Sequence, residues 1–195
     1  MGGVILLIIL GVVVLYGVGA YNGLISLKNQ TLNAFKQIDV QLKRRHDLIP
    51  NLVNAVKGAM DFEKSTLEAV IQARNQAVAV NANAAPDAMK QVAAAENQLT
   101  AALSRFNVVV EQYPQLKATG NVAQLQEELT STENRISFAR QGYNDTATQY
   151  NTKQQQFPTS MVAGMAGAAP AELWQIDDQA DRAVPQVDLS MKPKA

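Results

Sequence analysis

The sequence predicts an all-α protein, with one N-terminal transmembrane helix followed by an antiparallel four-helix bundle of long helices. An uninterrupted apolar run occupies Gly3–Ala20, and further along the chain apolar residues recur at helical spacing in four separate stripes. Only 6% of the residues are aromatic, so the core of the bundle should be aliphatic. We expect three parts: an anchor over residues 1–21, the bundle over residues 22–157, and an Ala/Gly/Pro-rich tail over residues 158–195.

The apolar run has the length and composition of a membrane span. At 1.5 Å per residue its 18 residues form a helix of about 27 Å, close to the ~30 Å of a hydrocarbon core. The competing interpretation is a cleaved signal peptide, but the run has no basic segment before it and is longer than is usual for one. Lys28 and Lys36 follow the span, which predicts a cytoplasmic location for the bundle.

The first helix of the bundle should cover Leu24–Leu42, and the sequence around Arg45–Pro50 then reads as a stop and a restart. Asp47 can cap a new helix, and a proline is tolerated in a first helical turn. The tight turn predicts that the first helix and a second helix over residues 49–80 form an antiparallel hairpin.

Two further helices complete the expected bundle. Residues 81–87 have the composition of a loop, a third helix should run from Met89 to Tyr113, and a fourth stripe spans Val122–Tyr150. In the tail we expect a short docked segment near Ala171–Ile176 and disorder beyond about Asp181.

Several charged residues interrupt the apolar stripes and should therefore be paired inside the bundle. Antiparallel register places Glu96 level with Arg74 and Arg140, which predicts a structural Arg74–Glu96–Arg140 ion cluster. The alternative, a carboxylate-bridged dimetal site, requires Glu-x-x-His pairs on facing helices, whereas the chain has a single histidine. No metal site is predicted.

Lys43, Arg44, Arg45 and His46 form the most conspicuous basic run. They can be the solvated end of a helix, where cations complement the helix dipole, or a patch that binds a protein partner. The run should lie far from the bilayer, which makes lipid a poorer partner for it.

The tail supplies a second candidate surface. Met161, Met165, Leu173 and Trp174 can touch the lipid interface, where tryptophan is favoured, or they can cover the open end of the bundle.

Composition excludes several kinds of chemistry. The chain has no cysteine, and the phosphate-binding, dinucleotide-binding, serine-hydrolase and zinc-protease motifs are missing. Lys/Arg and Asp/Glu number 17 each, so nothing indicates nucleic-acid binding. We expect a protein that is not an enzyme and uses no cofactor.

Four stretches resemble the bacterial LemA family of membrane proteins. These are the run from Tyr21 to Gly58 around QIDVQLKRRHDLIPNLV, then EKSTLEAVIQAR (Glu63–Arg74), ENRISFARQGYNDTATQYN (Glu133–Asn151) and FPTSMVAGMAG (Phe157–Gly167). The resemblance implies a single N-terminal span, an all-α soluble domain and no established enzymatic activity. A LemA-like branch is associated with magnetosome membranes, which suggests membrane organisation as a role.

Together these observations predict a membrane-anchored helical scaffold of the bacterial inner membrane, bound to lipid through its span. It would act by homo-oligomerisation or by association with protein partners that the sequence does not identify. The alternative is a membrane-remodelling protein whose tail inserts into lipid.

Overall fold

The computed structural model describes residues 1–57, 64–81, 88–117 and 120–174, and these residues are helical apart from short turns and an extended final segment. The all-α prediction is confirmed. The helices are α1 (Gly2–Lys57), α2 (Lys64–Asn81), α3 (Met89–Glu111), α4 (Pro114–Lys117), α5 (Gly120–Gln155) and α6 (Thr159–Ala163). Of the expected loop over residues 81–87, Asn81 is the last residue of α2, and the rest lies outside the described residues, as does the expected tail disorder beyond about Asp181.

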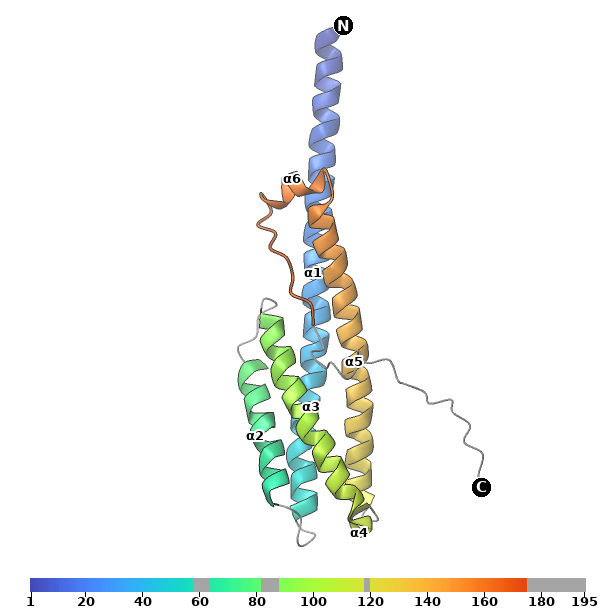
Figure 1. The fold of residues 1–195 in the computed structure, drawn as a ribbon. Coiled ribbons are helices and arrows are strands. Elements are labelled where there is room, and N and C mark those ends of the chain that lie inside the picture. The colour runs from blue at the N-terminus through green and yellow to red at the C-terminus, as the bar shows by residue number, and fades with distance from the viewer. Residues whose placement is uncertain (58–63, 82–87, 118–119, 175–195) are drawn as a thin grey trace, which may run out of the picture.

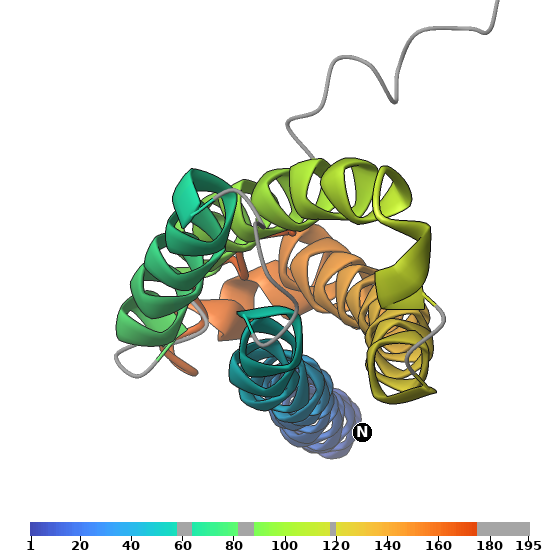
Figure 2. The same cartoon turned by 90° about the horizontal axis from the view of Figure 1, so that it is seen from below.

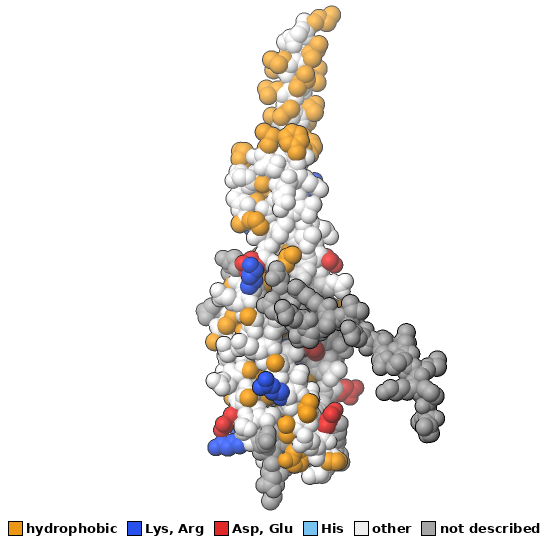
Figure 3. Space-filling view, in the orientation of Figure 1, with side chains coloured by type: hydrophobic (Ala, Val, Ile, Leu, Met, Phe, Trp, Pro, Cys, Tyr) orange, Lys and Arg blue, Asp and Glu red, His pale blue; other side chains and the backbone are white. Residues whose placement is uncertain are grey.

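The N-terminal third of α1 stands free of the rest of the molecule (Figure 1). Its large apolar side chains from Val4 to Val18 are all exposed, and Ala20 is the first buried residue of the helix. Apolar side chains surround this free segment on all visible sides (Figure 3). Such a helix is long and apolar enough to cross a membrane, as the sequence predicts.

The predicted turn at Arg45–Pro50 is wrong, because α1 continues without interruption to Lys57. A proline inside a helix removes the hydrogen bond to the carbonyl four residues earlier, which here belongs to His46. Arg74, on α2, supplies the missing donor: its Nε donates to the His46 carbonyl over 3.1 Å. Asp47 therefore caps no helix, and α2 begins only at Lys64.

Below the free segment, α1, α2, α3 and α5 run alternately down and up and surround a shared interior (Figures 1 and 2). The interior is built from aliphatic side chains of all four helices and from Phe106. Its fully buried members include Ile49, Val56, Val70, Leu99, Phe106 and Val110. The third and fourth apolar stripes of the sequence thus face the core as periodicity predicts.

The upper part of the molecule is built differently, because α2 and α3 reach only about halfway up α1 (Figure 1). Here α1 and α5 pack against α6, through a small cluster of Leu24, Tyr150 and Ala163. After α6 the chain reverses direction at Gly167, whose φ of 57° favours glycine. Hydrogen bonds from Gly167 N to Gly164 O and from Ala168 N to Ala163 O complete a Schellman motif.

The chain then runs back along α5 to Trp174, and two asparagines hold it there. Asn151 accepts a hydrogen bond from the Ala171 amide at 2.8 Å and donates one to the Ala171 carbonyl at 2.9 Å. Asn144 makes the same pair of bonds to Trp174, at 2.8 and 3.0 Å. Asn144 and Asn151 are seven residues apart on a helix, and the residues that they bind, Trp174 and Ala171, are three residues apart in an extended segment. Both separations are about 10 Å, so each asparagine lies beside the residue that it binds.

Tyr143 adds a third attachment, since its hydroxyl donates to the Glu172 carbonyl over 2.6 Å. Burial, followed by the nearby Glu172 charge, raises the pKa of Tyr143 to about 12. The folded protein therefore favours the neutral phenol, which is the form able to donate this bond, and the attachment weakens as the pH rises from about 10 toward 12.

The passage of α1 through Pro50 can be tested with a double-mutant cycle. In Arg74→Leu the His46 carbonyl loses its donor, so we expect the free energy of unfolding to fall by about 1–3 kcal/mol. In a Pro50→Ala background the same replacement should cost about 1 kcal/mol less, because alanine restores the helical N–H donor. Chemical unfolding of the four full-length proteins in detergent micelles measures this coupling. Equal costs in the two backgrounds would contradict the role assigned to Arg74.

Candidate functional site

A buried ionic centre lies in the middle of the bundle, around Glu96 of α3. Glu96 is fully buried, and its Oε1 lies 2.7 Å from His46 Nε2 and accepts a hydrogen bond from Asn81 Nδ2 at 3.2 Å. Its other oxygen, Oε2, accepts a hydrogen bond from Arg45 Nη1 at 3.4 Å. Both oxygens of the only fully buried carboxylate among the described residues are thus engaged.

Arg45 links this carboxylate to α5. Its Nη1 also lies 3.2 Å from Glu133 Oε2, while its Nη2 donates to Thr100 Oγ1 over 2.8 Å. Glu133 in turn pairs with Arg140 at 3.6 Å, and the Arg140 guanidinium lies 5.2 Å from the centre of the Trp174 ring. A chain of alternating charges therefore connects α3, α1, α5 and the docked tail.

The pKa of Arg140 is lowered from its ordinary value. Burial lowers the pKa of its guanidinium, Glu133 acts in the opposite direction, and Arg45 adds to the lowering. An arginine remains charged at neutral pH despite such a shift, so Arg140 is available to neutralise Glu133.

The predicted Arg74–Glu96–Arg140 cluster is wrong in its partners, although Glu96 is the buried acid that it required. Glu96 binds Arg45 and His46, Arg74 donates to the His46 carbonyl, and Arg140 pairs with Glu133. The error follows from the supposed turn, because a helix that continues past Asp47 carries Arg45 and His46 into the core on the face that holds Leu42 and Ile49.

The predicted basic patch is wrong for the same reason. Arg45 and His46 are buried, while Lys43 and Arg44 remain exposed. Arg44 lies 4.0 Å from Glu128 in an exposed pair that contributes little. A solvent-facing patch of four residues does not exist in this structure.

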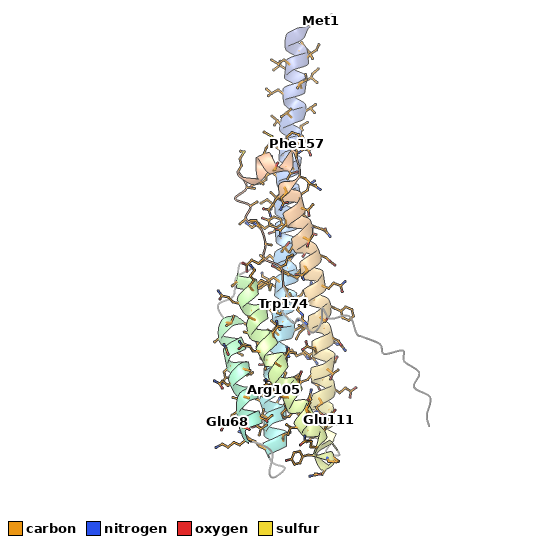
Figure 4. All side chains as sticks on the ribbon, in the orientation of Figure 1. Met1, Glu68, Arg105, Glu111, Phe157 and Trp174 are labelled. Atoms are coloured by element: carbon orange, nitrogen blue, oxygen red, sulfur yellow. The ribbon has the colours of Figure 1, made fainter. Side chains whose placement is uncertain are left out.

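The tail candidates divide into two groups. Leu173 is half-buried and Trp174 is only 3% exposed, packed into a cluster with Met89, Ile136 and Tyr143. Of the two alternatives, contact with lipid is therefore wrong for these two residues, and packing against the bundle is the one observed, because the asparagine clamps direct them inward. Figure 4 shows Trp174 among the helices near the upper end of α3, well below Phe157. Met161 and Met165 remain exposed.

A polar cleft of about 410 Å³ separates α3 from α5 beside the ionic centre. Its walls carry hydroxyl and amide side chains, with Arg45 and Glu133 at its inner side. They include Thr100, Ser104, Asn107, Gln126, Thr130 and Asn134. Within the described ranges no three His, Cys, Asp or Glu side chains group closely enough to hold a metal ion.

An exposed apolar face on the outer side of α1 and α5 was missed by the sequence reasoning. Phe138 is 75% exposed and Val40 is 62% exposed, and both line a groove of about 600 Å³ between the two helices. The available signal was that Phe138 falls off the apolar stripe of its helix, which runs through Ile136, Ala139 and Tyr143. A large aromatic side chain on the polar face of a helix marks a candidate contact surface.

The LemA family model matches residues 34–189. The chain belongs to the LemA family. This confirms the resemblance seen in the sequence, and together with the free apolar helix it makes the chain a membrane-associated helical protein. Both clamp residues, Asn144 and Asn151, lie within the LemA match.

Individual relatives are distant. Protein LemA from Metamycoplasma hominis is 29% identical over 147 residues, which cover 75% of this chain but only 64% of that protein's length. Magnetosome protein MamQ 2 from Paramagnetospirillum magneticum is 25% identical over 89% of this chain and 72% of its own. Magnetosome protein MamQ from Magnetospirillum gryphiswaldense is 22% identical with the same coverage.

The structural importance of the ionic centre can be tested by Glu96→Ala. Removal of this carboxylate leaves Arg45 and His46 without their buried partner, so the free energy of unfolding should fall by about 3–5 kcal/mol. Glu68→Ala is the matched control, because Glu68 pairs with Lys64 at 3.7 Å in an exposed position and should cost less than about 0.5 kcal/mol. Comparable, small losses for the two variants would show that the centre does not stabilise the fold.

Proposed function

We propose that this LemA-family protein is a non-enzymatic membrane scaffold that associates with a second copy of itself through the outer face of α1 and α5. The observation that carries the proposal is the exposure of Phe138 and Val40 beside a groove between α1 and α5, outside the membrane span. A Phe side chain is a large apolar contributor when it becomes buried in an interface.

The groove is suited to a symmetric contact between two copies. Each copy is anchored by its own N-terminal span, so all copies have the same orientation in the bilayer. A two-fold axis between two copies must therefore run along the membrane normal. Val40 and Phe138 line the same groove from neighbouring helices, which places them at the same height. Rotation about that axis would set Phe138 of one copy against Val40 of the partner subunit and repeat the contact on the other side.

Two basic residues at the groove have to be accommodated in this contact without being buried. Lys36 and Arg135 line the groove with the two apolar residues, so each copy contributes positive charge near the interface. Their long side chains can remain solvated at the rim while their apolar stems pack, as is common at helical interfaces. Phe138 and Val40 would then form the dry centre.

A structural role for the buried ionic centre supports the absence of catalysis. The Glu96 oxygens are both occupied by side chains of the bundle itself, and Arg45 is shared between Glu96, Glu133 and Thr100. A general acid or base needs access to a substrate proton, which these saturated groups do not offer.

We place the protein in the bacterial inner membrane with its bundle in the cytoplasm. Lys28 and Lys36 are the first charged residues after the span, and the side of a span richer in Lys and Arg is retained in the cytoplasm. The relatives named magnetosome proteins support a role in organising a membrane or an envelope complex. The alternative of lipid remodelling by the whole tail is weakened by the burial of Trp174.

Site-directed crosslinking tests the proposed contact. The chain has no native cysteine, so a Val40→Cys/Phe138→Cys protein should form disulfide-linked dimers on mild oxidation in native membranes. Val108→Cys, on α3 and 58% exposed, is the control and should remain monomeric. Phe138→Ser should weaken dimerisation of the otherwise native protein at least about tenfold, since each copy loses the burial of one Phe. The proposed contact would be ruled out if the Val40→Cys/Phe138→Cys and Val108→Cys proteins crosslinked equally and Phe138→Ser dimerised as well as the native protein.

A further inference from the structure

Three exposed apolar side chains lie where the bundle meets the free part of α1. Phe157 is 81% exposed, Met161 is 70% exposed and Met165 is 86% exposed, and they belong to the turn between α5 and α6, to α6 and to the turn that follows α6. We refer to Phe157, Met161 and Met165 as the collar. Figure 4 shows Phe157 at the end of α5, beside α1 and next to its free segment.

The length of the free helix fixes the height of the bilayer. Gly3–Ala20 spans about 27 Å, slightly less than the ~30 Å hydrocarbon thickness that it has to cross. Side chains become buried by the bundle from Ala20 onward, so α1 has no polar spacer between its apolar segment and the bundle. The bilayer surface must therefore reach the upper end of the bundle.

The upper end of the bundle has the composition of a membrane-facing surface. Tyr21, at the end of the span, is exposed, and aromatic residues are favoured at the lipid headgroup level. Neither residues 2–38 nor residues 146–171 contain an Asp or Glu, whereas they contain Lys28, Lys36 and Lys153, of which Lys28 is the nearest to the span and Lys153 the nearest to Phe157 in sequence. Anionic headgroups would thus meet two cations near the collar and no carboxylate from these segments.

We infer that the collar inserts into the headgroup layer of the leaflet on the bundle side and seats the bundle on the bilayer surface. The packing of α6 against α1 and α5 makes this contact rigid, because Ala163 is buried with Leu24 and Tyr150 while Met161 points outward to solvent. The membrane thus holds the protein at two places, the span and the collar, and limits its tilt and rotation. This inference depends on the span and not on the proposed self-association.

Site-directed spin labelling of the full-length protein tests the inference. Because the chain lacks cysteine, Phe157→Cys, Met161→Cys and Met165→Cys can each carry a single nitroxide in nanodiscs of phosphatidylcholine and phosphatidylglycerol. Val108→Cys is the control, since it is a 58% exposed apolar position outside the proposed self-association face, near the end of α3 that lies away from the span. Collision rates with oxygen, which concentrates in lipid, and with a water-soluble nickel chelate report the environment of each label.

The three collar labels should collide several times more often with oxygen relative to nickel than the Val108→Cys label does. Adding Met165→Asp to Phe157→Cys should lower this ratio without changing the circular dichroism spectrum, because position 165 is exposed. Collar labels as accessible to nickel as the control would overturn the inference. Collar labels shielded from both reagents would also overturn it, since that result indicates coverage by protein instead of lipid.

Discussion

The rest of the structure depends on α1 remaining helical across Pro50. A break at this position would separate the membrane span from the core of the bundle, whereas a continuous helix of 56 residues belongs to both. The continuity relies on Arg74, which donates to the carbonyl that proline leaves without its helical partner. One side chain on α2 thereby supports the helix that both crosses the membrane and enters the core of the bundle.

The ionic chain sets the register of the helices that pack on α1. Arg45 pairs with Glu96 on α3 and with Glu133 on α5, and Arg140 extends the chain to Trp174 of the docked tail. A shift of any one helix by a turn would leave at least one desolvated charge without its partner, which costs several kcal/mol. Aliphatic side chains can repack after a small shift of one helix along another, whereas the ion pairs cannot re-form. The charges therefore fix the register of the helices more strictly than the aliphatic core does.

The features that could be predicted from the sequence are those set by local periodicity. The free apolar helix, the helix over α3 and the burial of Glu96 follow from composition and spacing in single segments. The partners of Glu96 could not be predicted, because the Asp47–Pro50 stretch has the local pattern of a helix start, which places Arg45 and His46 in a turn. The helix continues through this stretch with the support of Arg74, which is distant in sequence, and so brings Arg45 and His46 to Glu96. The inward position of Trp174 likewise depends on Asn144 and Asn151, which resemble ordinary surface residues until the extended tail lies beside them.

The most direct test of this account is the distance between two spin labels on α1, measured by double electron–electron resonance on the full-length protein in nanodiscs. Asn22→Cys and Asn54→Cys both lie at exposed positions, on either side of Pro50. A continuous helix predicts about 48 Å between the two backbone positions, since 32 residues separate them at 1.5 Å each. A hairpin that turned at residues 45–50 would bring them to about 27 Å, and a distribution centred there would contradict the account.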